Sequence, residues 1–469
     1  MFIPHTPSDR ASMLEAVGVE SLKALFQDIP LKHRFPTLDL PPALTEMEAV
    51  AELREISMLN EGTQELICFL GAGAYHHYIP SVVDAIISRG EFYTAYTPYQ
   101  PEISQGTLQA IFEYQSLIAA LTGMNVCNAS HYDGATAVAE AVNMAYAVFR
   151  GKRNKIVISN ALHPQYRQTV RTYTQGGGIK IVEQAEEVAI DQLLSTAPEA
   201  LIPLLDENTA LVIVQYPDFF GRVFDMSVLT KAAHDVGALI AVAVNPIALG
   251  LFKPPGDFGV DIVTGEGQPL GIPLSFGGPY LGLFATRTEY IRKMAGRLVG
   301  ETVDNQGQRA YVLTLTAREQ HIRREKATSN ICTNQGLMAL ASAVYLSALG
   351  KQGLKKVAAL NYHKAHYAAE CIAKIPGFKV YTEQLFFNEF VVSSSKPIDE
   401  VFSYLLDYGI LGGYHLGKDY ISLEHAFLMA VTEMNTREEI DFLVEVLQKV
   451  GEKDPSFSNP FKAEVSHGH

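Results

Sequence analysis

The side chains best suited to binding or chemistry gather in one non-periodic stretch, Tyr93–Gly106, just before an amphipathic helical segment. This stretch contains three tyrosines, two prolines and several amides and hydroxyls. Loops that combine rigid aromatic and hydrogen-bonding side chains often line pockets. The same composition also suits a well-packed connection, and the residues by themselves favour neither interpretation.

A second candidate lies at Asn128–Thr136, where a strand-like run ends and an alanine-rich helix begins. The free N–H groups and the positive dipole end of a helix N-terminus suit a phosphate. Asp133 opposes a phosphate there, because its charge would repel the anion and its carboxylate is a favoured helix cap. We therefore expect Asp133 to cap the helix.

His163 follows the β-rich run 155–159 and precedes Pro164. An imidazole at the carboxyl end of a strand is placed to stack on a planar cofactor, but a single histidine is more often structural. The residues alone favour the structural role.

Four further patterns fail as sites. Gly71-Ala72-Gly73 begins like a dinucleotide fingerprint, but His76 takes the place of the third glycine. The neighbours His76 and His77 point apart, which favours structural roles over a metal site. The four cysteines are scattered without a CxxC pair, and the terminal His-Gly-His suits a flexible tail. No metal site is predicted.

Composition narrows the class of protein. The 469 residues carry 51 acidic and 37 basic side chains, a net charge of −14 that argues against a nucleic-acid binder. Hydrophobic residues make up 48% and charged residues 19%, as in ordinary globular proteins. We see no signal-peptide pattern, and the longest uncharged apolar stretch, 238–252, is too short for a membrane helix. We expect a cytoplasmic protein with no membrane partner.

An α/β fold is predicted to position these residues. β-rich runs separated by helical segments recur at 155–159, 179–183, 211–215, 238–244, 260–264 and 280–285. Apolar strands that alternate with helices indicate a mostly parallel sheet covered on both faces. The predicted parts are an N-terminal helical arm (1–60), a large α/β domain (61–330), a small α+β domain (331–453) and a flexible tail (454–469). The arm either wraps a partner chain or packs on its own domain.

Five motifs occur in a consistent order: YTAYTPYQPEISQG, NASHYDGATAVAEA, VQYPDFFG, the glycine-rich run 265–282, and REQHIRREKATSNICT at 318–333. Together they resemble the amino-terminal half of the glycine-cleavage P-protein. The resemblance runs from the first ten residues to about residue 450, and the length is similar to that of the separate first subunit of split bacterial enzymes. It implies the fold-type-I pyridoxal-phosphate-dependent transferase fold, like that of aspartate aminotransferase.

The resemblance also indicates what the chain lacks. Pyridoxal-phosphate enzymes need a lysine to bind the cofactor covalently and an acid to keep its ring nitrogen protonated. Gln268 stands in the lysine's place, and Ala243 is matched to the acid. His163 matches the stacking histidine, while Asp133 and Gly134 stand in the phosphate-binding region. The prediction is a degenerate pocket that cannot anchor the cofactor.

The resemblance further implies a partner, because two such folds pair across a large interface that holds shared active sites. It places toward the shared region the loop residues Tyr96, Thr97, Tyr99, Gln100, Glu102 and Gln105, and the basic-segment residues Lys326 and Thr328. A phenol or amide can orient the carboxylate of glycine, and a lysine or hydroxyl can reach a phosphate across the interface. The alternative for the basic segment is a solvated helix face.

The implied reaction is the decarboxylation of glycine, with transfer of the aminomethyl group to the lipoyl arm of H-protein. The implied assembly is a heterodimer or heterotetramer with a P-protein subunit 2 that bears the pyridoxal phosphate. Two alternatives stay open. The chain is either a non-catalytic scaffold or regulator, or an independent pyridoxal-phosphate lyase or transaminase that uses another lysine.

Overall fold

The computed structural model describes residues 5–184, 189–316, 319–327 and 329–450. The chain divides into two compact units, Met1–Glu61 and Gly62–His469. The first unit contains α1 (Pro7–Val17) and α2 (Glu46–Ser57), with single 3-10 turns at Leu22–Phe26 and Leu31–His33 between them. Both α-helices begin with a threonine capping box, and neither contains a buried residue.

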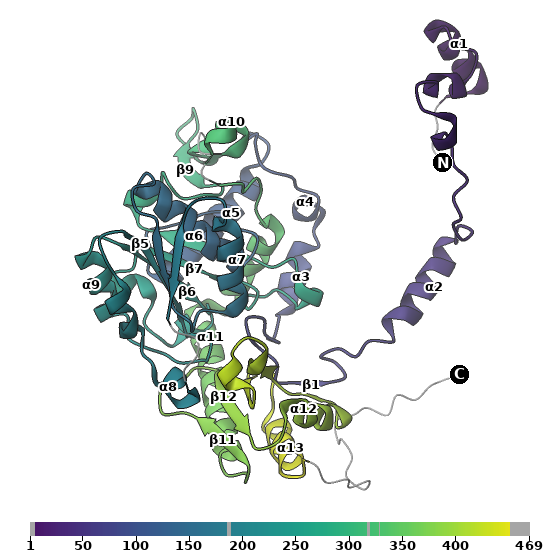
Figure 1. The fold of residues 1–469 in the computed structure, drawn as a ribbon. Helices are drawn as coiled ribbons and strands as arrows, with labels where there is room; N and C mark the ends of the chain where they lie inside the picture. The colour runs from purple at the N-terminus through teal and green to yellow at the C-terminus, as the bar shows by residue number, and fades with distance from the viewer. Residues whose placement is uncertain (1–4, 185–188, 317–318, 328, 451–469) are drawn as a thin grey trace. The chain divides into compact units, whose positions relative to one another are not determined.

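The second unit is built on a large sheet that includes β5, β6 and β7 in Figure 1. The sheet has seven strands in the spatial order β2-β8-β7-β6-β5-β3-β4. Its strands are β2 (Val126–Cys127), β3 (Lys155–Ile158), β4 (Lys180–Glu183), β5 (Thr209–Tyr216), β6 (Leu239–Val244), β7 (Ile262–Glu266) and β8 (Gly282–Thr286). The neighbouring strands in the series β4-β3-β5-β6-β7 all pair in parallel. Strand β8 pairs antiparallel with both β7 and β2. The predicted mostly parallel sheet is confirmed.

Helices cover both faces of this sheet because its strands are apolar on both sides. On β6, Leu239, Ala241 and Ala243 pack toward α6 (Gly134–Val148) and α7 (Pro164–Thr174). The intervening Ile240 and Val242 pack on the other face, toward α5, α9 and the first half of α11. These three helices span Gln105–Thr122, Ser227–Asp235 and Gly336–Ile372. Shorter helices are α3 (Ser81–Ile87), α4 (Gly90–Tyr93), α8 (Ile190–Ser195) and α10 (Gln320–Arg323).

A smaller antiparallel sheet, in the order β11-β12-β15-β14, forms the C-terminal part of the unit. Its strands are Phe378–Tyr381, Glu389–Ser394, Ala426–Ala430 and Tyr414–His415, and it packs against α12 (Ile398–Asp407) and α13 (Arg437–Gln448). Gly350 interrupts α11 with φ 58°. The short strand β1 (Ile67–Cys68) pairs in parallel with β13 (Ile410–Leu411), a long-range pairing that the sequence did not reveal.

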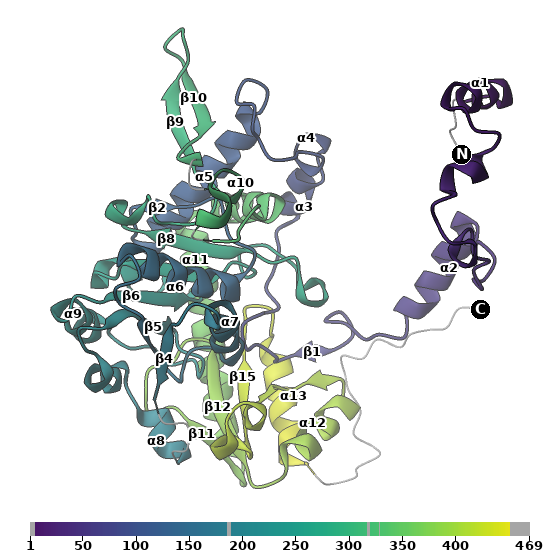
Figure 2. The ribbon, with the colours of Figure 1, turned by 45° about the horizontal axis from the view of Figure 1, so that its top comes forward.

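Sequence reasoning also missed a hairpin, β9 (Val299–Val303) and β10 (Arg309–Leu313), which projects beside α5 in Figure 2. Two glutamines of α5 hold its base. Gln115 exchanges hydrogen bonds with the N–H (3.0 Å) and carbonyl (2.9 Å) of Val299. Gln105 does the same with Tyr311, at 2.9 Å for each bond. Among the described residues, no helix is long and apolar enough to cross a membrane.

Candidate functional site

Gln268, at the position matched to the cofactor lysine, lies two residues after β7 and is 1% exposed. Its Oε1 accepts a hydrogen bond from the Tyr75 N–H at 2.9 Å. Its Nε2 donates to the carbonyls of Tyr75 (3.0 Å) and Ile272 (2.8 Å). The side chain amide therefore uses its oxygen and both N–H groups to clamp two backbone segments together.

The N-terminus of α6 is capped by the chain itself. The Thr136 N–H donates to Asp133 Oδ1 at 2.8 Å, and the Asp133 N–H donates to Thr136 Oγ1 at 3.2 Å. This reciprocal pair is a capping box, so the cap predicted at Asp133 is confirmed. The N–H of Gly134, the first helical residue, donates to Glu266 Oε2 at 2.9 Å.

Glu266 is the anion at this helix N-terminus. Besides Gly134, the N–H groups of Gln268 (3.0 Å) and Leu281 (3.1 Å) donate to its Oε1. Three backbone donors that converge on one carboxylate favour its charged form, but burial outweighs them and raises the pKa of Glu266 to about 7. A cofactor phosphate and the Glu266 carboxylate cannot occupy this position together.

Both ring nitrogens of His163 form hydrogen bonds within the chain. Its Nδ1 accepts from the Gln165 N–H (3.2 Å), so Nε2 carries the proton and donates to the Ala72 carbonyl (2.8 Å). The ring stacks on Tyr166, with 4.8 Å between ring centroids, and meets Phe219 edge-on at 4.9 Å. Burial lowers the pKa of His163. The structural role that the residues alone favoured agrees with these contacts.

Glu389, at the start of β12, accepts hydrogen bonds from the segment that contains Ala72 and Tyr75. The Ala72 N–H donates to its Oε1 (2.7 Å) and the Tyr75 hydroxyl to its Oε2 (2.8 Å). Burial raises the pKa of Glu389 to about 7. A Cβ on Gly71 would lie 2.6 Å from Glu389 Oε1, so only glycine fits this close approach. The loop from Gly71 to Tyr75 is thus held by Glu389 and by Gln268.

The residues present do not fit pyridoxal phosphate. Residue 268 has no amine, the N-terminus of α6 already holds the Glu266 carboxylate, and the ring of His163 lies between other side chains. Ala243, on β6 and 1% exposed, supplies no acid for a ring nitrogen. Residue 268 therefore offers no covalent attachment, although Gln268 and Tyr75 help to line a cavity of about 620 Å³.

The tyrosine-rich loop is exposed instead of buried. Tyr96 is 83% exposed, Tyr99 is 52% exposed, and both Gln100 and Glu102 are exposed. Tyr96 and Thr97 help to line a cavity of about 200 Å³ whose other walls come from α4, α5 and the start of α11. The pocket-lining interpretation of the loop therefore fits its geometry.

Gln105 lies apart from the other candidates. Its side chain amide exchanges two hydrogen bonds with the backbone of Tyr311 on the hairpin. Its Nε2 also donates to the Pro101 carbonyl at 2.7 Å. All its hydrogen-bonding capacity serves the local fold. In the basic segment, Lys326 is exposed at the end of a 3-10 turn, Arg324–Lys326. Thr328 lies outside the described residues.

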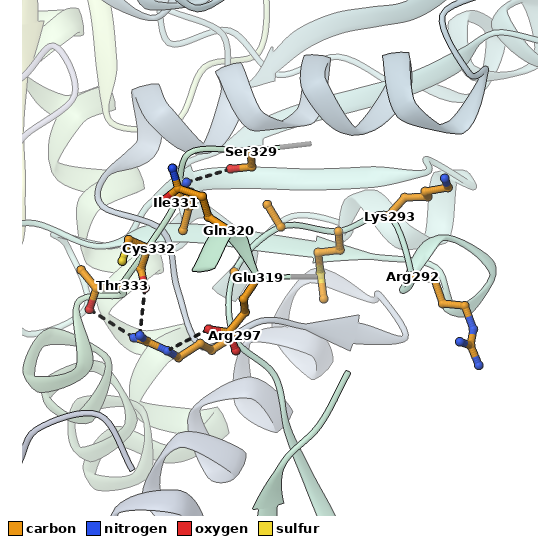
Figure 3. Close-up of a pocket in the computed structure, with 12 residues that line it drawn as sticks. Arg292, Lys293, Arg297, Glu319, Gln320, Ser329, Ile331, Cys332 and Thr333 are labelled. Carbon is orange, nitrogen blue, oxygen red and sulfur yellow. Dashed lines mark hydrogen bonds and ion pairs between the residues drawn. The ribbon is translucent and has the colours of Figure 1, made fainter. Parts of the chain in front are cut away.

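Arg297 is the residue that sequence reasoning overlooked. It is 5% exposed and connects the tyrosine-rich loop to the segment that follows α10. Its guanidinium donates to the Tyr99 hydroxyl, the Cys332 carbonyl, Thr333 Oγ1 and Asn334 Oδ1. Figure 3 shows Arg297 extended toward Cys332, Thr333 and Glu319. A single arginine before an apolar run forms no motif, so only the tertiary contacts reveal it.

The pair His76-His77 does not form a metal centre. His77 Nδ1 lies 2.8 Å from Glu433 Oε2. Within the part of the chain that the structure describes, no three His, Cys, Asp or Glu side chains are grouped to hold a metal ion. The terminal His-Gly-His lies outside that part.

The architecture defines the class of protein. A mostly parallel sheet between helical layers, followed by a smaller antiparallel part, is the fold of fold-type-I pyridoxal-phosphate-dependent transferases. A sphingosine-1-phosphate lyase from Burkholderia pseudomallei shares this fold, with a TM-score of 0.63 and 15% identity over 90% of this chain and 94% of that one.

Sequence similarity then defines the family. Residues 1–447 match the family described as Glycine cleavage system P-protein. The chain is 56% identical over 449 residues to a probable glycine dehydrogenase (decarboxylating) subunit 1 from Thermomicrobium roseum, covering 96% of this chain and 99% of that protein. A crystal structure of glycine decarboxylase (P-protein) in inhibitor-bound form superposes with a TM-score of 0.87 at 42% identity, covering 96% of this chain and 100% of that one. The chain belongs to the glycine cleavage system P-protein family.

Proposed function

We propose that this chain is the subunit of glycine dehydrogenase (decarboxylating) that does not anchor pyridoxal phosphate. It acts with a second subunit that carries the cofactor, and the complex decarboxylates glycine and passes the aminomethyl group to the lipoyl arm of H-protein. The observation that carries this proposal is near-full-length similarity to proteins named subunit 1, at 56% identity, in a chain with a hydrogen-bonded glutamine at residue 268.

The hydrogen bonds of Glu266 and Gln268 support the proposal that the cofactor is bound by a second chain. Glu266 and Gln268 each make three hydrogen bonds within the chain, so a pyridoxal-phosphate lyase based on this pocket is disfavoured. Among the candidate site residues, Tyr96, Tyr99 and Lys326 are exposed on the surface. Exposed aromatic groups of this kind suit an interface with another chain.

The proposed roles follow from side chain chemistry. Tyr96, Thr97, Tyr99 and the exposed Gln100 present hydroxyl and amide groups, which can bind the carboxylate of glycine held by the partner. Lys326 presents a point charge on a flexible stem, which can approach a phosphate in the partner subunit. These side chains orient and bind, and the carbanion chemistry belongs to the cofactor in the partner.

The first experiment uses the isolated chain. It is mixed with pyridoxal phosphate, treated with borohydride and analysed by intact mass. We expect no covalent adduct, because Gln268 offers no amine. A stoichiometric adduct on any lysine would establish the independent lyase or transaminase.

The second experiment uses the complex reconstituted with the pyridoxal-phosphate-bearing subunit. Tyr96→Ala and Lys326→Ala are expected to lower glycine decarboxylation while the complex still assembles. Lys351→Ala, at an exposed lysine on α11, is the matched control. If both test variants assemble and turn over normally, the chain is a scaffold and its loop makes no contribution to the site.

A further inference from the structure

We propose that Arg297 is a positioning residue that fixes the tyrosine-rich loop against the segment 332–334, so that both meet the partner subunit as one rigid surface. The inference rests on the proposed function, because it concerns the presentation of Tyr99 to a shared site. Arg297 itself is buried and contacts neither substrate nor cofactor in this account.

The hydrogen bonds of the guanidinium divide between two segments that are far apart in sequence. Nη2 donates to the Tyr99 hydroxyl (3.2 Å) and to the Cys332 carbonyl (2.8 Å), while Nη1 donates to Thr333 Oγ1 (3.2 Å) and Asn334 Oδ1 (3.1 Å). The guanidinium carbon also lies 5.6 Å from the centroid of the Tyr99 ring. One side chain thus orients both the hydroxyl and the ring of an otherwise half-exposed tyrosine.

The segment 332–334 is in turn fixed to the connection between β2 and α6. Asn334 Nδ2 donates to the Ala129 carbonyl at 2.9 Å, and the Ala129 N–H donates to the Arg297 carbonyl at 2.9 Å. The Cys332 N–H donates to the Tyr132 hydroxyl at 3.2 Å. Tyr99 is therefore connected through Arg297 to the turn that precedes α6.

The planar fork of arginine is essential to this arrangement. Four acceptors lie around its two terminal nitrogens, and a lysine ammonium at the end of a flexible stem cannot reach them together. Glu319 supplies the nearby counter-charge, with its Oε2 3.9 Å from Arg297 Nε, and its side chain is 11% exposed. A buried cation with a carboxylate beside it is stable only with such a set of partners.

The test measures kcat and KM for glycine in the reconstituted complex. Arg297→Lys keeps the charge and is expected to lower kcat by about 10- to 100-fold, the scale on which a small misplacement acts, with a smaller change in KM. Tyr99→Phe removes only the hydroxyl that Arg297 contacts, and the double variant is expected to lose less than the product of the two single effects because both break one contact. Millimolar guanidinium is expected to restore part of the kcat of Arg297→Ala, whereas ammonium is not.

The matched control is Arg292→Ala, at an exposed arginine that points away from this group in Figure 3. Assembly is measured separately by size-exclusion chromatography. If Arg297→Lys assembles and keeps full kcat while Tyr96→Ala is impaired, the positioning role is refuted and the proposed function stands. If Arg297→Lys, Tyr99→Phe and Tyr96→Ala all turn over normally, the shared-site function itself fails. Multiplicative effects of Arg297→Lys and Tyr99→Phe would also refute the coupling.

Discussion

Replacement of Glu266 tests the conclusion that its carboxyl group holds three backbone N–H groups together, one of them at the N-terminus of α6. The N–H groups of Gly134, Gln268 and Leu281 all donate to it. Each buried donor left without an acceptor costs about 1–3 kcal/mol, so Glu266→Ala removes about 6 kcal/mol of favourable interaction at mid-range. Burial of the ionised carboxylate opposes these bonds, as its pKa of about 7 shows, so the expected net loss at pH 8 is smaller, about 1–3 kcal/mol.

The assay is urea unfolding of the isolated chain at pH 8, followed by circular dichroism. Glu266→Gln is expected to lose less than Glu266→Ala, because its amide oxygen still serves the N–H groups of Gln268 and Leu281 while its NH₂ faces the Gly134 donor. The exposed Glu301 on β9 provides the control, and Glu301→Ala is expected to change stability by about 0.5 kcal/mol or less. A loss below about 1 kcal/mol for Glu266→Ala, with an unchanged denaturant slope, would refute the reasoning.

Three further predictions concern the buried carboxyl groups, residue 268 and the hairpin. Burial raises the pKa values of Glu140, Glu266 and Glu389 to about 7, so the stability that these carboxyls contribute is fully present below about pH 4.5 and is lost as the pH rises through 7. Urea midpoints should therefore fall between pH 5 and pH 8 by less in Glu266→Gln than in the unchanged protein, and equal falls would contradict this. Gln268→Lys is expected to remain free of borohydride-fixed pyridoxal phosphate, because Glu266 still occupies the N-terminus of α6, and an adduct at residue 268 by peptide mapping would show that the pocket is open. Gln115→Leu removes both bonds to the first hairpin strand, so amide hydrogen exchange over 299–313 should accelerate, and unchanged protection would show that the clamp is dispensable.

The sequence by itself determined the features that depend on short-range patterns. Apolar runs alternating with helical segments indicated the parallel sheet, because strand burial and helix periodicity are local properties. The cap at Asp133 followed from its place before an alanine-rich helix. The ordered motifs indicated the family, and Gln268 at the lysine position indicated a chain that does not anchor the cofactor.

Only the tertiary structure showed which distant residues meet at the candidate site. Gly134 and Glu266 are 132 positions apart in the chain, and Tyr75 and Glu389 are 314 apart. Arg297 meets Tyr99 across 198 positions. No local pattern encodes such contacts, because a buried carboxylate or guanidinium takes its role from whichever donors and acceptors the folded backbone brings to it.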